Sequence, residues 1–179
     1  MITVKTLREY IKEAEEKGVA IGHFNISNLE GFHGVYNAAK KLNVPVIIGL
    51  SEGEEDFVGR NEAIGIIKQI RAKENFPIFL NADHHYSFER VKLAVDAGFD
   101  SVIFDGANLS FNENVKITKQ CVEYARSVNS TILVEAELGY IGSGSNIKET
   151  VPEGAGILTK SEDAKKFGAN ALFALESSI

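Results

Sequence analysis

The 179-residue chain has 19 basic and 25 acidic side chains, a formal net charge of −6 and 44% hydrophobic residues, the composition of a folded globular domain. Its basic residues are scattered among acids, so we expect no nucleic-acid partner, and no apolar run approaches the roughly 20 residues of a membrane helix. The charged N-terminal segment is no signal peptide, and the single Cys121 cannot form an internal disulfide, so we expect a cytoplasmic protein.

Short apolar runs alternate with helical patterns along the whole chain. The first helix follows a capping box at Thr6 and Glu9 and ends at Gly18, and a second box at Ser27 and Glu30 opens the next helix. Later helices are predicted around residues 62–73, 88–97 and 117–128, and after a cap at Thr159. Strands are predicted at 19–24, 44–50, 77–81, 101–104, 131–136 and 171–175.

Regular strand–helix alternation with short connections predicts a parallel sheet with right-handed crossovers. A doubly wound nucleotide-binding sheet is disfavoured, because the first crossover lacks the G-x-G-x-x-G pattern. A (β/α)8 barrel fits better, although a complete one takes about 250 residues. We therefore predict an α/β fold of the TIM type, here an incomplete barrel of about six βα units that forms a single domain over residues 1–179.

Polar residues stand at the C-terminal end of each of the first five predicted strands. In α/β barrels this rim carries the catalytic groups. Any one of these residues alone is explained equally well as a turn or cap, but five in succession favour a site. They are Asn25, Ser51, the run Asp83-His84-His85, Asp105, and Glu135 with Glu137.

The acidic residues of this rim predict a metal ion. Glu135 and Glu137 are two positions apart on a strand and share one face, where two carboxylates are costly to bury without a cation. Asp105 on the neighbouring strand can join them. Beside Asp83, His84 is expected to face the barrel mouth as a ligand, whereas His85 is not.

Two further segments invite a functional interpretation. Ser51-Glu52-Gly53 offers a hydroxyl and backbone N–H groups to a phosphate. Residues 138–156 form a connection too long for an ordinary barrel loop, with five glycines, which indicates a mobile lid at the rim. The alternative for the long connection is a surface insertion without a role.

Several stretches between residues 18 and 164 resemble the class II, metal-dependent fructose-bisphosphate and tagatose-bisphosphate aldolases. They are HFNISNLEG, NAAKKLNVPVIIGLSEG, NADHH, AVDAGFDSVIFDGANLSFNENVKITK and ILVEAELGYIGSGS. The resemblance implies a (β/α)8 barrel that cleaves fructose 1,6-bisphosphate reversibly into dihydroxyacetone phosphate and glyceraldehyde 3-phosphate. It also implies catalytic Zn²⁺, with a second divalent ion or a monovalent cation, and a homo-oligomer in complete members.

The same resemblance implies roles for individual residues. Asp83 is the acid–base group at the C4 hydroxyl, and His84 is a ligand of the catalytic zinc. Asp105 and Glu137 match positions that bind a second metal or the displaced zinc. Asn25 and Ser51 match substrate-binding positions, with Ser51 near glyceraldehyde 3-phosphate.

The chain also departs from the family pattern. Two further zinc histidines and the late glycine-rich phosphate loop have no counterpart, so we expect a C-terminally truncated member without useful activity alone. The lid has Ser-Gly-Ser where relatives carry paired acids, which leaves Glu149 and Glu153 as candidate lid acids. The alternatives are a degenerate, non-catalytic barrel that serves as a binding or assembly module, and a metal-dependent epimerase or isomerase.

Overall fold

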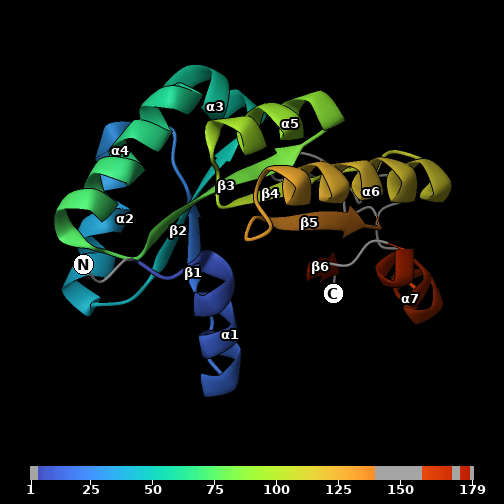
Figure 1. The fold of residues 1–179 in the computed structure, drawn as a ribbon, viewed down its shortest axis with the longest axis horizontal. Coiled ribbons are helices and arrows are strands. Elements are labelled where there is room, and N and C mark those ends of the chain that lie inside the picture. Colours follow the sequence, from blue (N-terminus) through green and yellow to red (C-terminus); the bar gives the residue numbers. More distant parts are fainter. Residues whose placement is uncertain (1–3, 140–158, 171–173, 178–179) are drawn as a thin grey trace, which may run out of the picture.

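The computed structural model describes residues 4–139, 159–170 and 174–177, and within these ranges six parallel strands form one sheet in the order β1-β2-β3-β4-β5-β6. Figure 1 shows the strands fanning through the centre of the molecule, with most of the helices along one side of them. The strands are β1 (Gly22–Asn25), β2 (Val46–Ser51), β3 (Ile78–His85), β4 (Ser101–Phe104), β5 (Leu133–Leu138) and β6 (Ala174–Ser177). The predicted incomplete barrel is confirmed in this arrangement.

Most of the helices begin at a side-chain cap. The helices are α1 (Leu7–Lys17), α2 (Leu29–Leu42), α3 (Glu52–Val58), α4 (Arg60–Glu74), α5 (Phe88–Ala97), α6 (Phe111–Val128) and α7 (Ser161–Asn170). The predicted capping box at Thr6 and Glu9 is present. The second prediction was wrong by one residue: Asn28 caps α2, because its side chain accepts from Gly31 N–H over 2.8 Å. Thr159 instead donates its hydroxyl to the Leu138 carbonyl over 3.0 Å.

Helix α3 was not predicted. Ser51, the last residue of β2, is its N-cap, and Glu54 completes a capping box with it. The tripeptide Ser51-Glu52-Gly53 therefore opens a short helix at the C-terminal rim and does not form an open loop. Strand β3 also runs further than expected, to His85.

The main core lies between the sheet and the helices that cover one of its faces. Ile48, Leu80 and Phe104 point to this face and are essentially inaccessible to solvent, and they pack with Ala94 of α5 and Cys121 of α6. In Figure 1, α3, α5 and α6 run along this side of the sheet. The burial of these apolar side chains supplies most of the driving force for folding.

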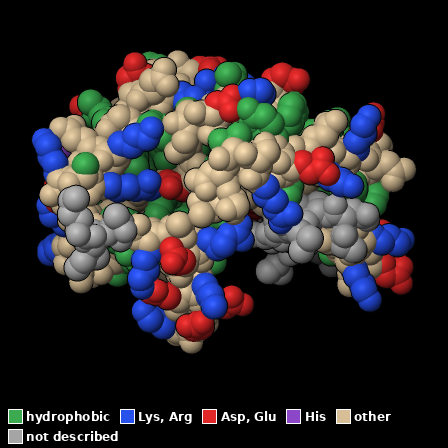
Figure 2. All heavy atoms as spheres, viewed as in Figure 1, with side chains coloured by type: hydrophobic (Ala, Val, Ile, Leu, Met, Phe, Trp, Pro, Cys, Tyr) green, Lys and Arg blue, Asp and Glu red, His purple; other side chains and the backbone are tan. Residues whose placement is uncertain are grey.

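The opposite face of the sheet is the interior of the barrel. By strand alternation, Phe79 points to this face, and its ring lies 5.5 Å from the ring of Tyr10 on α1. Helix α1 therefore packs against the interior face near the N-terminal ends of the strands, below the sheet in Figure 1. Figure 2 shows acidic and basic side chains interspersed over α1. No helix within the described ranges is long and apolar enough to cross a lipid bilayer.

Candidate functional site

The end of β3 departs from regular strand geometry at its histidine pair. The pairing of β3 with β4 shifts register between Ala82 and His85, and His84 adopts a left-handed backbone with φ of 49°. The two histidines consequently lie in different surroundings. His85 is fully buried, 3.5 Å from Glu55 of α3, whereas His84 is half-buried beside Asp105 and Glu137.

The structure brings His84, Asp105 and Glu137 into one cluster. Nδ1 of His84 lies 3.1 Å from Oδ2 of Asp105 and 3.1 Å from Oε2 of Glu137. Their potential ligand atoms all lie within 4.8 Å of one another. The three side chains come from the ends of β3, β4 and β5, because neighbouring parallel strands end at the same rim of the sheet.

The two carboxylates dominate the electrostatics of this cluster. The neighbouring carboxylates, Asp105 first and then Glu137, raise the pKa of His84 to about 11. Burial alone raises the pKa of Asp105, but the hydrogen bonds from His84 and from Ala107 N–H outweigh it, so the net pKa is lowered. With two carboxylates and one imidazole, the cluster favours the binding of a cation.

The hydrogen bonding of the Glu137 carboxylate indicates whether a metal ion fits this cluster. Its Oε2 is buried without a hydrogen bond, although His84 Nδ1 is only 3.1 Å away. The single hydrogen on Nδ1 is directed to Asp105, so it does not satisfy Glu137 as well. A buried carboxylate oxygen without a partner is costly, and one imidazole with two carboxylates is a donor set that divalent cations accept. The residues present fit a metal ion.

Asp83 lies beside this cluster and is held by an amide. Asn25 Nδ2 of β1 donates to Asp83 Oδ2 over 2.7 Å. His84 Nε2 is 4.0 Å from the other oxygen of Asp83. Strand β1 approaches closely because Gly49 on β2 has no side chain: a Cβ there would lie 2.1 Å from Asn25 Oδ1. Asn25 thus fixes a carboxylate at the edge of the candidate metal site.

Ser51 joins the same rim through Glu54. The Ser51 hydroxyl and Ser51 N–H each donate to Glu54 Oε2 over 2.8 Å, and Asn25 Nδ2 lies 3.0 Å from the same oxygen. The structure therefore brings six predicted residues to one rim, whereas Glu135 is not part of the metal-binding cluster in the described residues. The six are Asn25, Ser51, Asp83, His84, Asp105 and Glu137. Glu149 and Glu153, the candidate lid acids, lie outside the described residues.

Sequence reasoning missed three residues that support the site. Glu54 accepts hydrogen bonds from the hydroxyl and N–H of Ser51, and the S-x-x-E spacing of this capping box was a readable signal. Glu55 is buried next to His85, where Arg60 and Arg90 also contact it. Buried Asn114 of α6 donates to the Glu137 carbonyl over 2.9 Å.

Asn114 also fixes the loop after Asp105. Its Oδ1 accepts from Thr118 over 3.1 Å, and a Cβ on Gly106 would lie 2.4 Å from it. The polar Asn114 and Thr118, spaced four apart on a buried helix face, were the available sequence signal for this support.

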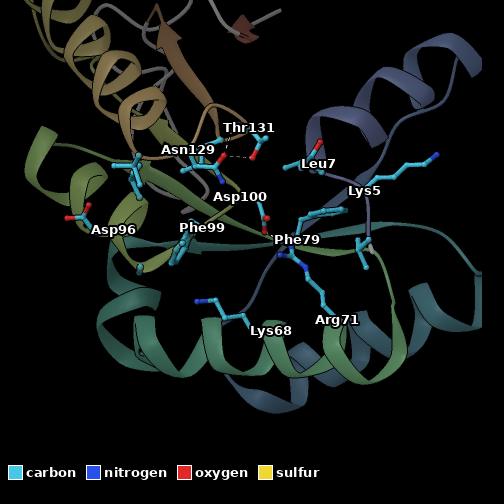
Figure 3. Close-up of a pocket in the computed structure, with 17 residues that line it drawn as sticks. Lys5, Leu7, Lys68, Arg71, Phe79, Asp96, Phe99, Asp100, Asn129 and Thr131 are labelled. Carbon is cyan, nitrogen blue, oxygen red and sulfur yellow. Dashed lines mark hydrogen bonds and ion pairs between the residues drawn. The ribbon is translucent and has the colours of Figure 1, made fainter. Parts of the chain in front are cut away.

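A cavity of about 410 Å³ lies at the other end of the strands (Figure 3). Arg71 and Asp100 point toward one another there, 2.5 Å apart, and Arg71 also donates to the Ile78 carbonyl over 2.7 Å. The guanidinium lies over the Phe79 ring, 4.9 Å from its centroid. Because its charge is neutralised, we interpret Arg71 as a stabilising residue and not as part of a second binding site.

A family model described as fructose-bisphosphate aldolase class-II matches residues 5–175. The fructose-bisphosphate aldolase of Geobacillus stearothermophilus is 39% identical over 144 residues, which are 79% of this chain and 50% of that protein. The aldolase of Staphylococcus aureus strain Mu50 is 39% identical over 140 residues, 76% of this chain and 48% of the relative. The chain thus spans about half the length of these curated relatives.

Solved structures agree with the sequence relatives. The YdjI aldolase of Escherichia coli K12 superposes with a TM-score of 0.79 at 27% identity, covering 98% of this chain and 61% of that protein. The fructose-bisphosphate aldolase of Campylobacter jejuni gives the same TM-score at 22% identity, which supports the fold.

Proposed function

Because the chain belongs to the class II fructose-bisphosphate aldolase family, we propose that it carries the metal-binding and proton-transferring residues of a ketose-bisphosphate aldolase. The proposed reaction is the reversible cleavage of fructose 1,6-bisphosphate into dihydroxyacetone phosphate and glyceraldehyde 3-phosphate. The observation that carries this proposal is the cluster of His84, Asp105 and Glu137 beside Asp83.

His84, Asp105 and Glu137 would hold Zn²⁺, and a second divalent ion or a monovalent cation is part of the proposal. Zinc would supply positive charge to the ketone oxygen of the dihydroxyacetone phosphate half, which removes the need for a Schiff-base lysine. The left-handed turn at His84 and the hydrogen bond from Asn114 to the strand end of Glu137 orient these ligands before substrate binds.

Asp83 is the base of the cleavage step. As the C3–C4 bond breaks, Asp83 accepts the proton of the C4 hydroxyl, and C4 becomes the carbonyl carbon of the aldehyde. The electron pair stays on C3 of the dihydroxyacetone phosphate half, which is then protonated. We assign this second proton to Glu149 or Glu153. Asn25 holds Asp83 in place through its amide.

We place the aldehyde half of the substrate next to Ser51 and Asn25. Asn25 donates to Asp83, and Ser51 is opposite Asp83 in the pairing of β2 with β3, which supports this role. The setting that we propose is central carbohydrate metabolism, in glycolysis and gluconeogenesis, in the cytoplasm. We propose a homo-oligomer as the assembled form, without nucleic-acid or membrane partners.

The test separates binding from turnover. The purified chain is titrated with dihydroxyacetone phosphate by calorimetry, with zinc and after treatment with a chelator, and triose phosphate release from fructose 1,6-bisphosphate is followed in the same samples by a coupled assay. We expect binding that requires zinc and is lost in Glu137→Gln. We expect Asp83→Asn to keep the binding and to lower any turnover at least about 100-fold. Equal binding with and without zinc would contradict the proposal.

A further inference from the structure

The carboxylate of Glu54 occupies the end of the site next to Ser51. One of its oxygens, Oε2, lies within hydrogen-bond distance of three donors: the Ser51 N–H at 2.8 Å, the Ser51 hydroxyl at 2.8 Å and the Asn25 amide at 3.0 Å. The Asn25 nitrogen is also 2.7 Å from Asp83 Oδ2. Glu54 therefore both completes the capping box of α3 and forms part of the rim around Asp83.

These donors are the ones that the proposed function gives to the aldehyde half of the substrate. A phosphate group that took the Ser51 hydroxyl and N–H would have to displace Glu54, which would lose three hydrogen bonds and the cap of α3. The displaced carboxylate would remain next to a phosphate dianion, and like charges at such distances repel strongly.

The neighbouring positive charges do not offset Glu54. Arg60 and Arg90 contact Glu55, and Arg90 also lies 2.8 Å from Asp56, so both arginines are held by other acids of α3. Asp83, on the other side of Asn25, adds a further carboxylate. The charged groups that contact Ser51 and Asn25 are thus the carboxylates of Glu54 and Asp83.

We propose that Glu54 selects an uncharged aldehyde end. The preferred substrates are then ketose 1-phosphates whose far end carries a hydroxyl group, and the released aldehyde is unphosphorylated. A hydroxyl can donate a hydrogen bond to the Glu54 carboxylate, whereas a phosphate dianion offers only acceptors. A fixed repulsive group is an effective way to reject one of two otherwise similar ligands. This inference rests on the proposed aldol cleavage, and it changes the preferred substrate from a ketose bisphosphate to a ketose 1-phosphate.

The first experiment measures binding and does not depend on turnover. Amide resonances of Ser51 and Asn25 in the zinc-loaded chain are followed during titration with glyceraldehyde and with glyceraldehyde 3-phosphate. In the wild type we expect glyceraldehyde to bind more tightly than its phosphate ester. In Glu54→Gln, which keeps an oxygen acceptor but removes the charge, we expect the affinity for the ester relative to glyceraldehyde to rise about tenfold or more.

Two further variants test whether the change in preference comes from the Glu54 carboxylate itself. One removes the Glu54 side chain beyond Cβ, and the other removes a negative charge at a distant position. Glu54→Ala should show the same change in preference, so agreement between the two variants assigns the effect to the carboxylate. Glu16→Gln removes one negative charge from an exposed position on α1, which packs near the N-terminal ends of the strands, and should leave the preference at the wild-type value. Thermal unfolding of each variant verifies that it is folded.

The second experiment compares cleavage of fructose 1-phosphate with cleavage of fructose 1,6-bisphosphate in the same proteins. Turnover by this chain is expected to be low, and at high protein concentration we expect the wild type to cleave fructose 1-phosphate faster than the bisphosphate and Glu54→Gln to shift the ratio of the two rates toward the bisphosphate. A wild type that prefers phosphorylated ligands, with the preference unchanged in Glu54→Gln, would overturn the inference. Binding of dihydroxyacetone phosphate that does not depend on zinc would count against the proposed function instead, and the binding ratios of glyceraldehyde and its phosphate ester would still decide the role of Glu54.

Discussion

The side-chain amide of Asn25 donates to Asp83 over 2.7 Å, although the two residues are 58 positions apart in the sequence. The same nitrogen lies 3.0 Å from Glu54 Oε2. Asn25 is thus a neutral donor between two carboxylates, and its replacement by a third carboxylate gives a direct test of the charge at this rim.

We predict that Asn25→Asp destabilises the metal-free chain at neutral pH by about 1–2 kcal/mol relative to Asn25→Ala, because three carboxylates then face one another. Repulsion raises the pKa of the new carboxyl group above its unfolded value. The penalty is therefore present at pH 7 and disappears as the pH falls below about 4. Urea unfolding at several pH values measures it. A difference between the two variants that does not change with pH would contradict the assigned geometry.

Gly49 is predicted to be necessary for the position of Asn25. In Gly49→Ala, the new Cβ would lie 2.1 Å from Asn25 Oδ1 and 2.4 Å from His23 Nε2, so both side-chain ends must move. We expect the side-chain amide resonances of Asn25 to shift, with unfolding free energy reduced by only about 1 kcal/mol.

The matched control for Gly49→Ala is Gly65→Ala on α4. A Cβ there meets no atom within 4 Å, so alanine should stabilise the chain by about 0.5–1 kcal/mol through its higher helix propensity. The amide of Asn25 should not respond to this control. Unchanged Asn25 resonances in Gly49→Ala would contradict the close contact of the Asn25 side chain with Gly49.

Cys121 is predicted to be unreactive in the folded protein. It is fully buried in the main core, and this burial raises the pKa of its thiol to about 12. At pH 8 the thiolate fraction is then on the order of one in ten thousand. Iodoacetamide should label the chain in urea but not in native buffer, as read by mass spectrometry. Complete labelling of the native chain within minutes would place Cys121 outside the core.

Arg71 is predicted to contribute to stability and not to the site. Arg71→Ala leaves the half-buried Asp100 carboxylate without its partner, and we expect a loss of about 1–3 kcal/mol with zinc affinity unchanged. Lys119→Ala, in an exposed pair with Glu123, is the control and should leave the unfolding midpoint near the wild-type value. A weaker zinc affinity in Arg71→Ala would show that the two ends of the barrel are coupled.

The sequence predicts most of the fold because apolar periodicity and caps are local signals. The order of strands and helices and the rim positions of Asp105 and Glu137 follow from them. Helix α3 could not be predicted as easily, because seven residues without an apolar stripe resemble a loop, and its stability depends on the contact of Glu55 with His85 and two arginines.

The sequence also does not predict which side chains at the site contact one another. Glu137 Oε2 is left without a hydrogen bond beside the left-handed turn at His84. No signal in the residues around His84 predicts this turn. The contact of Asn25 with Glu54 likewise requires the register of β1 on β2 and the absence of a side chain at Gly49.

The most direct test of the central claim is a zinc titration of the purified chain against a chromophoric chelator, with His84→Ala and His33→Ala compared in parallel. His33 lies exposed on α2, so it controls for the loss of any histidine. We predict that His84→Ala weakens zinc binding about 100-fold or more, whereas His33→Ala retains the wild-type affinity. Equal zinc affinity in the wild type and in folded His84→Ala would contradict the assignment of this cluster as the metal site.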